Sequence, residues 1–178
     1  VVAATVSESY GIYGPAFELL EHEPREPGRE DYLNSEKYEI RSWDLDDPAS
    51  LAPFITRINR IRRENRALHS NVSLRFHGTT NEQLLAYSKT SEETGETILT
   101  VVNLDPYNRQ TGFVGLDMNV LGLEGAAVFQ VHDLLGDARY TWHGSRNYID
   151  LDPWVVPAHV FRIRRQQRTE RDFDSDSA

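Results

Sequence analysis

Residues 51–68, with the sequence LAPFITRINRIRRENRAL, constrain the fold of this chain more than any other stretch. Apolar side chains recur there at steps of three and four residues, which places them on one stripe of an α-helix: Leu51, Phe54, Ile55, Ile58 and Ile61. Ser50 is a suitable N-cap, and Asn65 is a suitable exit residue. The apolar stripe must be buried, whereas the arginine-rich face opposite it is expected to be solvated.

The segment before this helix is predicted to contain a buried strand and a long polar loop. Residues 1–6, VVAATV, form a continuous apolar run, as in a strand buried on both faces of a parallel sheet. Residues 22–49 show no period, and a connection of that length is usually functional or disordered. Strand, loop and helix together predict one βα unit of the kind that builds a (β/α)₈ barrel, whose loops form the active-site face.

After Leu68 the hydrophobic period changes from helical to alternating. Strands are expected over residues 72–76, 84–90, 97–104, 112–116, 127–133, 138–143, 147–151 and 158–164. Residues 97–104, TILTVVNL, are the most hydrophobic of these and should form the centre of the sheet. The fold class is therefore α/β plus all-β, with a barrel end over residues 1–68, an antiparallel β-sandwich over 69–166 and a disordered acidic tail over 167–178.

Charge and composition disfavour several classes of function. The formal net charge is −9, with 28 acidic against 19 basic residues, which disfavours a protein that grips nucleic acid. Cysteine is absent, which excludes disulfides and thiolate metal sites and fits a reducing compartment. No apolar run approaches the roughly 20 residues that span a bilayer, so no membrane partner is expected. Because the chain begins without Met inside an apolar run, it suggests a piece of a longer protein.

The six histidines are dispersed and do not form the closely spaced pairs of helical zinc motifs. We therefore expect neither a metal nor another cofactor. Two tryptophans of the predicted sandwich, Trp142 and Trp154, could stack on sugar rings, although packing in the core or at a sheet edge is the commoner role.

Several segments carry a resemblance to a known family. INRIRRENRAL, LLAYSK, TILTVVNLDP, VHDLLGDARYTWHG and PAHVFRI look like the end of an enzyme of the α-amylase superfamily. More narrowly, SESYGIYGPAFELLE and DYLNSEKYEIR resemble the bacterial maltosyltransferases that use α-maltose 1-phosphate to extend α-1,4-glucans. The resemblance covers nearly the whole chain up to about residue 164.

This resemblance implies a retaining double displacement, with an aspartate nucleophile and a glutamic acid that alternates between acid and base. The partners would be α-maltose 1-phosphate and an α-1,4-glucan acceptor, in a cytoplasmic enzyme that dimerises through other domains. The catalytic carboxylates of the family lie on earlier barrel strands, so we assign no catalytic residue to this chain. Glu8, Glu18 and the acidic residues 44–47 are not promoted to replace them.

The resemblance also carries over a sugar-binding loop. The Lys-Tyr pair of its SEKY motif is Lys37 and Tyr38 here, and these residues are expected to contact the donor maltosyl unit. An ammonium group donates hydrogen bonds to sugar hydroxyls, and a tyrosine offers an apolar face and a hydroxyl. Weaker candidates are Ser35 and Glu36, which could orient the loop, and Tyr10 and Tyr13, which could border the sugar pocket or pack in the core.

Two alternatives remain open. The parent could be another hydrolase or isomerase of the α-amylase superfamily, which would be recognised by a donor that is not a phosphate ester. The chain could instead be a free-standing glucan-binding module, which a cluster of exposed aromatic side chains on the sandwich would favour. As a detached piece of a maltosyltransferase, the chain should be inactive alone.

Overall fold

The computed structural model describes residues 1–124 and 128–165. The predicted tail, residues 167–178, lies outside these described residues. So does residue 127, the first residue of the strand that was expected over 127–133. Contacts between residues divide the chain into two compact units, one formed by Val1–Ser9 with the chain from Ile61 onward, the other by Tyr10–Arg60. Each unit is described by itself. The predicted boundary at residue 68 stays a prediction.

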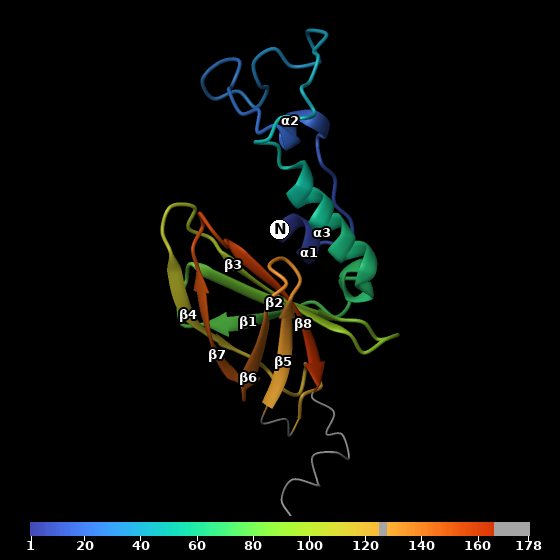
Figure 1. Cartoon of the computed structure of the whole chain (residues 1–178), viewed down its shortest axis with the longest axis vertical. Coiled ribbons are helices and arrows are strands. Elements are labelled where there is room, and N and C mark those ends of the chain that lie inside the picture. The colour runs from blue at the N-terminus through green and yellow to red at the C-terminus, as the bar shows by residue number, and fades with distance from the viewer. Residues whose placement is uncertain (125–127, 166–178) are drawn as a thin grey trace, which may run out of the picture. The chain divides into compact units, whose positions relative to one another are not determined.

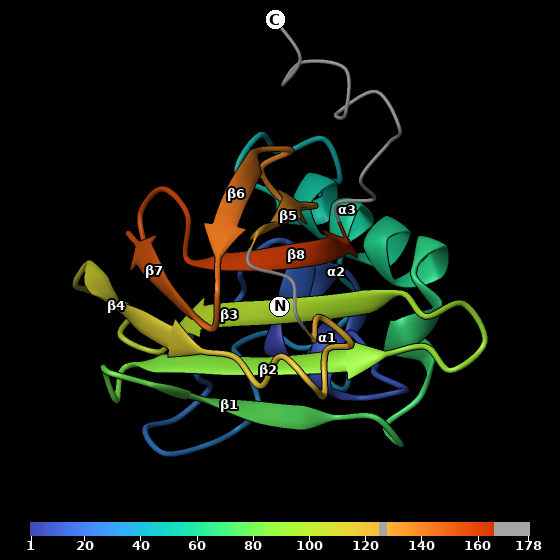
Figure 2. The ribbon, with the colours of Figure 1, turned by 90° about the horizontal axis from the view of Figure 1, so that it is seen from below.

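Eight strands form the larger part of the first unit within the described residues, and every pair of neighbours is antiparallel. Their order in the sheet is β6-β5-β8-β3-β2-β1-β4-β7, and Figure 2 shows β8, β3, β2 and β1 side by side. The bounds are β1 Arg75–Thr79, β2 Leu84–Thr90, β3 Thr97–Asn103, β4 Gln110–Gly115, β5 Val128–Asp133, β6 Arg139–His143, β7 Arg146–Leu151 and β8 Ala158–Arg165. All eight strands overlap the predicted segments, and the antiparallel arrangement is confirmed.

Strand β3 occupies the centre that its hydrophobicity predicts. All seven of its residues are buried, and it pairs with β2 on one side and β8 on the other. Its alternate side chains serve two cores: Leu99 and Val101 belong to the large core inside the folded sheet, whereas Ile98 packs on the outer face with Leu68 and Val160. Period-two alternation thus lets one strand be buried on both faces.

The sheet curls until its two edges come close. Strands β6 and β7 are joined by only the turn at Gly144 and Ser145, yet they stand at opposite ends of the strand order (Figure 1). A flat sheet would hold its outermost strands far apart. A connection of two residues between them therefore requires the sheet to fold back on itself. The predicted sandwich is therefore one continuous, nearly closed sheet rather than two separate ones.

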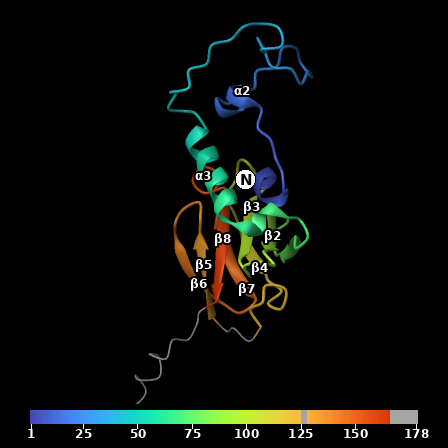
Figure 3. The ribbon, with the colours of Figure 1, turned by 90° about the vertical axis from the view of Figure 1, so that its right-hand side faces the viewer.

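The prediction of a buried strand over residues 1–6 is wrong. Residues Val2–Val6 form a short helix, α1, which lies beside β2 and β3 (Figure 3). The hydroxyl of Thr5 hydrogen-bonds that of Tyr87 on β2, and Ala4 is buried as well. A short apolar run fits a buried helical turn as well as a buried strand, and here packing against the sheet decides for the helix. The final βα unit of a barrel is accordingly not confirmed.

The long helix is confirmed with a break. α3 spans Ala52–Glu64, and a 3₁₀ turn, η1, follows over Arg66–His69. Ser50 accepts a hydrogen bond from the Ala52 amide, as an N-terminal cap should. Asn65 ends the helix in extended backbone, and its side chain donates to the Ile61 carbonyl.

Only part of each predicted helix face behaves as expected. Ile58 and Ile61 are buried, but Phe54 is exposed. On the arginine-rich face, Arg62 is not solvated, because its guanidinium donates to the carbonyls of three residues at the start of the chain: Ala4, Ser7 and Glu8.

Candidate functional site

The residues predicted to bind sugar belong to a polar loop in the unit Tyr10–Arg60. The loop follows α2, a helix over Gly14–Glu18 that has Pro15 in its first turn. An isolated bridge between Pro24 and Tyr32 closes the first part of the loop, and the Leu33 amide donates to the Glu23 carbonyl at 2.7 Å. Gly28 at the tip has φ +81°, a value that glycine adopts without strain. The loop is thus folded by its own backbone rather than extended.

The SEKY motif forms one tight turn. The Ser35 carbonyl accepts hydrogen bonds from the amides of Tyr38 and Glu39, at 2.9 and 3.1 Å. Asn34, just before the turn, has φ +55°, a left-handed conformation that asparagine tolerates better than most residues. Ser35 is buried, and within the described residues its hydroxyl has no hydrogen-bond partner. The turn leaves Glu36, Lys37 and Tyr38 exposed on its outer side.

Lys37 and Tyr38 share a carboxylate and form a charged cluster. The Lys37 ammonium is 3.8 Å from an oxygen of Asp31, and the Tyr38 hydroxyl donates to the same oxygen at 3.4 Å. The Arg25 guanidinium lies 4.2 Å from the centre of the Tyr38 ring, and the Lys37 ammonium lies 5.2 Å from it. The contact with Tyr38 and then the charge of Asp31 raise the pKa of Lys37 above its ordinary value, so Lys37 is a cation at neutral pH.

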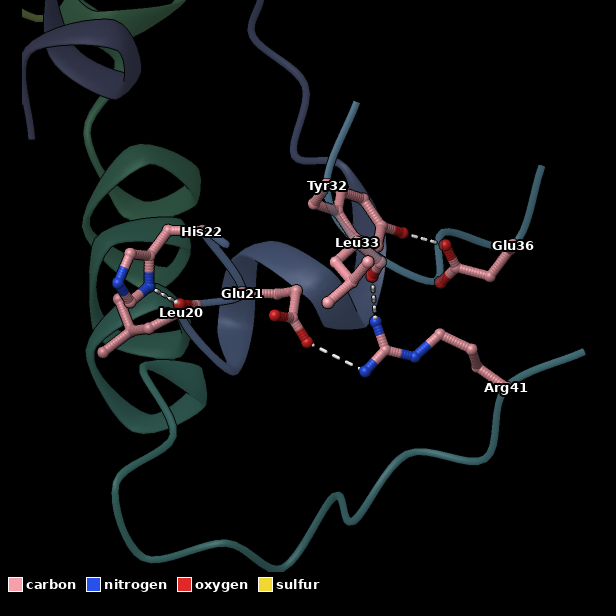
Figure 4. A network of polar contacts seen from close by, with 7 residues as sticks. All are labelled: Leu20, Glu21, His22, Tyr32, Leu33, Glu36 and Arg41. Carbon is pink, nitrogen blue, oxygen red and sulfur yellow. Dashed lines mark hydrogen bonds and ion pairs between the residues drawn. The ribbon is translucent and has the colours of Figure 1, made fainter. Parts of the chain in front are cut away.

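A second cluster, centred on Arg41, holds the base of the loop (Figure 4). The Arg41 guanidinium donates to the Glu21 carboxylate at 2.8 Å and to the Leu33 carbonyl at 3.3 Å. It also stacks 4.2 Å from the ring centre of Trp43. Arg41 is only partly exposed, so these contacts are better shielded from water than those of Lys37. The arginine therefore ties together segments twenty residues apart.

The remaining sequence candidates take different places. Tyr32 donates to the Glu36 carboxylate, and Tyr13 packs edge-on against Tyr32 with ring centres 6.2 Å apart. Tyr10 instead donates to Asn59 on α3, so the structure does not group it with Lys37 and Tyr38. The structure thus brings Tyr13 and Glu36 together through Tyr32.

The acidic residues 44–47 serve local turns. Asp44 accepts the Asp46 amide at 3.1 Å, and Asp47 accepts the Ala49 amide at 2.8 Å. Within residues 1–124 and 128–165, no three His, Cys, Asp or Glu side chains are grouped so that they could hold a metal ion. Over the same residues, no helix is long and apolar enough to cross a membrane.

Sequence reasoning missed Arg25, Asp31 and Arg41 as members of these clusters. Asp31 and Arg41 stand at the two ends of the quoted segment DYLNSEKYEIR, so the segment itself drew attention to the right place. The pairing of Arg25 with Tyr38 depends on the fold of the loop, and no residue spacing shows it.

Comparisons with known proteins cover the sheet and, for two curated relatives, most of the chain. Residues 76–163 match the family model described as "GLGE, C-terminal". The chain is 45% identical over 171 residues to the alpha-1,4-glucan:maltose-1-phosphate maltosyltransferase of Salinibacter ruber, which covers 96% of this chain and 25% of that protein. It is 44% identical over 163 residues to the enzyme of the same name from Methylacidiphilum infernorum. That alignment covers 92% of this chain and 24% of that protein. The chain thus spans about a quarter of the length of these curated relatives.

Solved structures resemble the chain in fold alone. The α-amylase of Geobacillus thermoleovorans matches with a TM-score of 0.53 at 14% identity, over 72% of this chain and 26% of that one. An Anoxybacillus α-amylase matches with a TM-score of 0.52 at 14% identity, over 72% of this chain and 25% of that one.

Proposed function

We propose that the chain, whose residues 76–163 match the GLGE C-terminal family model, is part of a retaining maltosyltransferase. This enzyme moves a maltosyl unit from α-maltose 1-phosphate to the non-reducing end of an α-1,4-glucan. The observation that carries the proposal is the similarity to maltosyltransferases over 96% of the chain, which includes the loop with Lys37 and Tyr38 as well as the sheet. The α-amylase likeness supports the superfamily through the fold only.

In the proposed reaction the chain contributes sugar contacts rather than the nucleophile. A carboxylate supplied by the rest of the enzyme displaces phosphate, and a glucan 4-hydroxyl then displaces that carboxylate, so the anomeric configuration is retained. The chain alone is accordingly inactive. Glu8, Glu18 and the turn-forming residues Asp44 and Asp47 take no catalytic role.

Lys37 and Tyr38 are proposed to bind the donor maltosyl unit. The side chain of Lys37 is 63% exposed and its ammonium is charged, so it can donate hydrogen bonds to sugar hydroxyls. Tyr38 is 51% exposed and offers its ring edge and hydroxyl next to that ammonium. Asp31 forms an ion pair with Lys37 and accepts a hydrogen bond from Tyr38, which favours one relative position of the two side chains before a sugar arrives. Such preorganisation reduces the entropy lost on binding.

Phosphate release from α-maltose 1-phosphate, with a short maltooligosaccharide as acceptor, tests this proposal. The full-length parent should release phosphate, whereas the 178-residue chain should not. Lys37→Ala in the parent should raise KM for the donor on the order of tenfold, because a charge-assisted hydrogen bond to the sugar is lost. Arg29→Ala is the matched control, since Arg29 is an exposed cation of the same loop that pairs only with Glu26 among the ion pairs of the described residues.

The outcomes separate the alternatives. A parent that leaves the phosphate ester intact but hydrolyses or isomerises plain α-glucan is another α-amylase-superfamily enzyme. A parent that does neither yet binds glucan is a binding protein. Equal KM values for Lys37→Ala, Arg29→Ala and the parent would remove Lys37 from the donor site while leaving the reaction in place.

A further inference from the structure

A pocket of about 280 Å³ opens along the seam where the two edges of the curled sheet approach each other. Strands β6, β7 and β8 contribute its lining, and most of that lining is aromatic. The side chains used below are Tyr140, Trp142, Tyr148, Asp150, His159 and Phe161. None of them belongs to the loop of Lys37 and Tyr38, and all of them lie in the unit that contains the sheet.

The floor of the pocket is a packed aromatic cluster. Trp142 and Phe161 are both buried, and their rings meet edge-on with centres 5.0 Å apart. The His159 ring stacks on Phe161 at 4.8 Å with an interplanar angle of 26°. Such mutual packing holds the rings in place without a ligand, so the floor is preformed.

Two tyrosines form the accessible walls. Tyr140 is 42% exposed and packs edge-on against Phe161, and Tyr148 is 55% exposed on the facing strand β7. Tyr148 packs edge-on against Phe113, its partner on the neighbouring strand β4, with ring centres 5.5 Å apart. Both tyrosines line the pocket and are partly exposed, so each offers a ligand an aromatic ring and a hydroxyl group.

The rim of the pocket is polar but carries little net charge. The Asp150 carboxylate accepts two hydrogen bonds from the Arg109 guanidinium, one of them at 2.6 Å. This bonding, and then the charge of Arg109, hold the pKa of Asp150 below its ordinary value despite some desolvation. The paired charges offset each other, so the rim does not select for an ionic ligand, yet the carboxylate can still accept a further hydrogen bond.

The His159 ring also contributes a polar group to the floor of the pocket. Its Nδ1 lies 2.9 Å from an oxygen of Asp133, whose carboxylate can only accept in its ionised form. In the neutral form of the ring this contact requires the proton on Nδ1, and Nε2 is then the nitrogen that can accept from a ligand hydroxyl.

Strand alternation keeps this pocket apart from the covered face of the sheet. On β8, Val160 packs with Leu68 of η1 and Ile61 of α3, whereas its neighbours His159 and Phe161 line the pocket. Helical segments therefore cover one face of β8, and the pocket uses the other.

The aromatic side chains and the polar groups of this pocket together match the chemistry of a sugar ring. Pyranose rings have apolar faces that stack on aromatic side chains and hydroxyl edges that need acceptors, and this pocket supplies both. Its volume lies just below the range typical of small-molecule sites, so it holds one terminal or bent part of a chain rather than a long segment. We propose that the seam pocket is a second α-glucan-binding site, which takes a glucosyl unit of the acceptor polymer remote from the reaction. This proposal rests on the proposed function for the identity of the polymer.

The test measures retention of the full-length parent in native gels that contain soluble amylose, with dextran gels as the comparison. Tyr148→Ala and Tyr140→Ala should each weaken retention by amylose about fivefold, because each removes one stacking wall. Tyr107→Ala is the matched control, since Tyr107 is an exposed tyrosine of the sheet unit outside the pocket. Thermal unfolding of each variant verifies that the fold is kept.

Kinetics give an independent reading of the same variants. KM for amylose as acceptor should rise about fivefold in Tyr148→Ala, while KM for α-maltose 1-phosphate and for a short maltooligosaccharide stays unchanged. Folded Tyr148→Ala and Tyr140→Ala proteins that amylose retains like the parent would overturn the seam site, and so would equal losses in Tyr107→Ala or in dextran gels. A parent that releases no phosphate but loses amylose retention in Tyr148→Ala would instead overturn the proposed function and leave the site standing.

Discussion

The hydroxyl oxygens of Thr5 and Tyr87 lie 2.6 Å apart, in the interior, although the two residues are 82 positions apart in the chain. The Thr5 hydroxyl is also 3.1 Å from the Val1 carbonyl, which can only accept, so the Thr5 proton points there and Tyr87 donates to Thr5. Burial raises the pKa of Tyr87 above its ordinary value, which keeps the phenol protonated for this role. One hydrogen bond thus fastens the first helix to the sheet.

Tyr87→Phe should lower the free energy of unfolding by about 1 kcal/mol, the usual net contribution of a buried hydrogen bond. The loss stays small because Thr5 keeps its bond to Val1. Thermal unfolding checks this, with Tyr107→Phe as the control because Tyr107 is exposed. An equal melting temperature for both variants would contradict the assigned bond.

Asp133 should make stability depend on acid pH. Its carboxylate is buried and accepts from the Leu135, Gly136 and Val160 amides and from His159. Burial alone would raise its pKa, but the bond from His159 and those from the backbone outweigh it, so the pKa lies below 3.8. A depressed carboxylate pKa gives stability that is present above the unfolded value and is lost as pH falls through the folded value.

Asp133→Asn should therefore destabilise the protein at neutral pH by on the order of 2 kcal/mol, and the deficit should shrink as the pH falls below about 4. Melting temperatures of the parent and of Asp133→Asn, measured at about four pH values from roughly 3 to 7, would show the two proteins converging at acid pH. Glu93→Gln is the control, since Glu93 is exposed. A deficit that is constant over this range would mean that ionisation of Asp133 contributes nothing.

Lys89 should make stability rise with pH as well, but in the alkaline range. Its side chain is buried on β2, with the ammonium 2.8 Å from the Asn71 amide oxygen. Burial, and then the charge of Arg62, lower its pKa from 10.5 to about 8. Between these two values the unfolded chain binds more protons than the folded one, so stability should rise with pH across that window.

Lys89→Met should remove that rise and should stabilise the protein by about 1 kcal/mol at neutral pH, since a buried charge is replaced by an apolar side chain of similar length. Chemical denaturation at neutral pH and across the window from about 8 to 10.5, which the two pKa values bound, measures both effects. Lys37→Met, at an exposed lysine, should keep the slope of the parent. Retention of the slope in Lys89→Met would assign it to another group.

Arg41→Ala should loosen the candidate donor loop, because Glu21, Leu33 and Trp43 lose their common partner. We expect faster limited proteolysis within residues 21–41 and a roughly tenfold lower kcat/KM for phosphate release by the parent. Arg41→Lys should show a proteolysis rate and a kcat/KM between those of the parent and Arg41→Ala, because an ammonium cannot bond in the geometry of the guanidinium fork. Unchanged proteolysis together with unchanged kinetics would show that Arg41 does not position the loop, and Arg29→Ala again serves as control.

The sheet was predictable because its signal is local. The hairpin strand expected over residues 84–90 and the apolar run at 97–104 are each visible in consecutive residues, and the structure places strands β2 and β3 there. The helix at 51–68 was predictable for the same reason, since its period of 3.6 is written in consecutive residues. The apolar run at residues 1–6 was not, because six residues are too few to distinguish a buried strand from a buried helical turn.

By itself, the sequence predicted the eight strands and the long helix, which depend on short-range patterns, and several of its segments carried the resemblance to a family. Only the tertiary structure decided that α1 is a helix docked on β2, that Asp31 sits between Lys37 and Tyr38, and that β6 and β7 meet at an aromatic seam. These relationships join residues whose spacing in the chain carries no period. They form because folding a polar loop and curling a sheet minimise exposed apolar surface and unpaired polar groups across the whole chain at once.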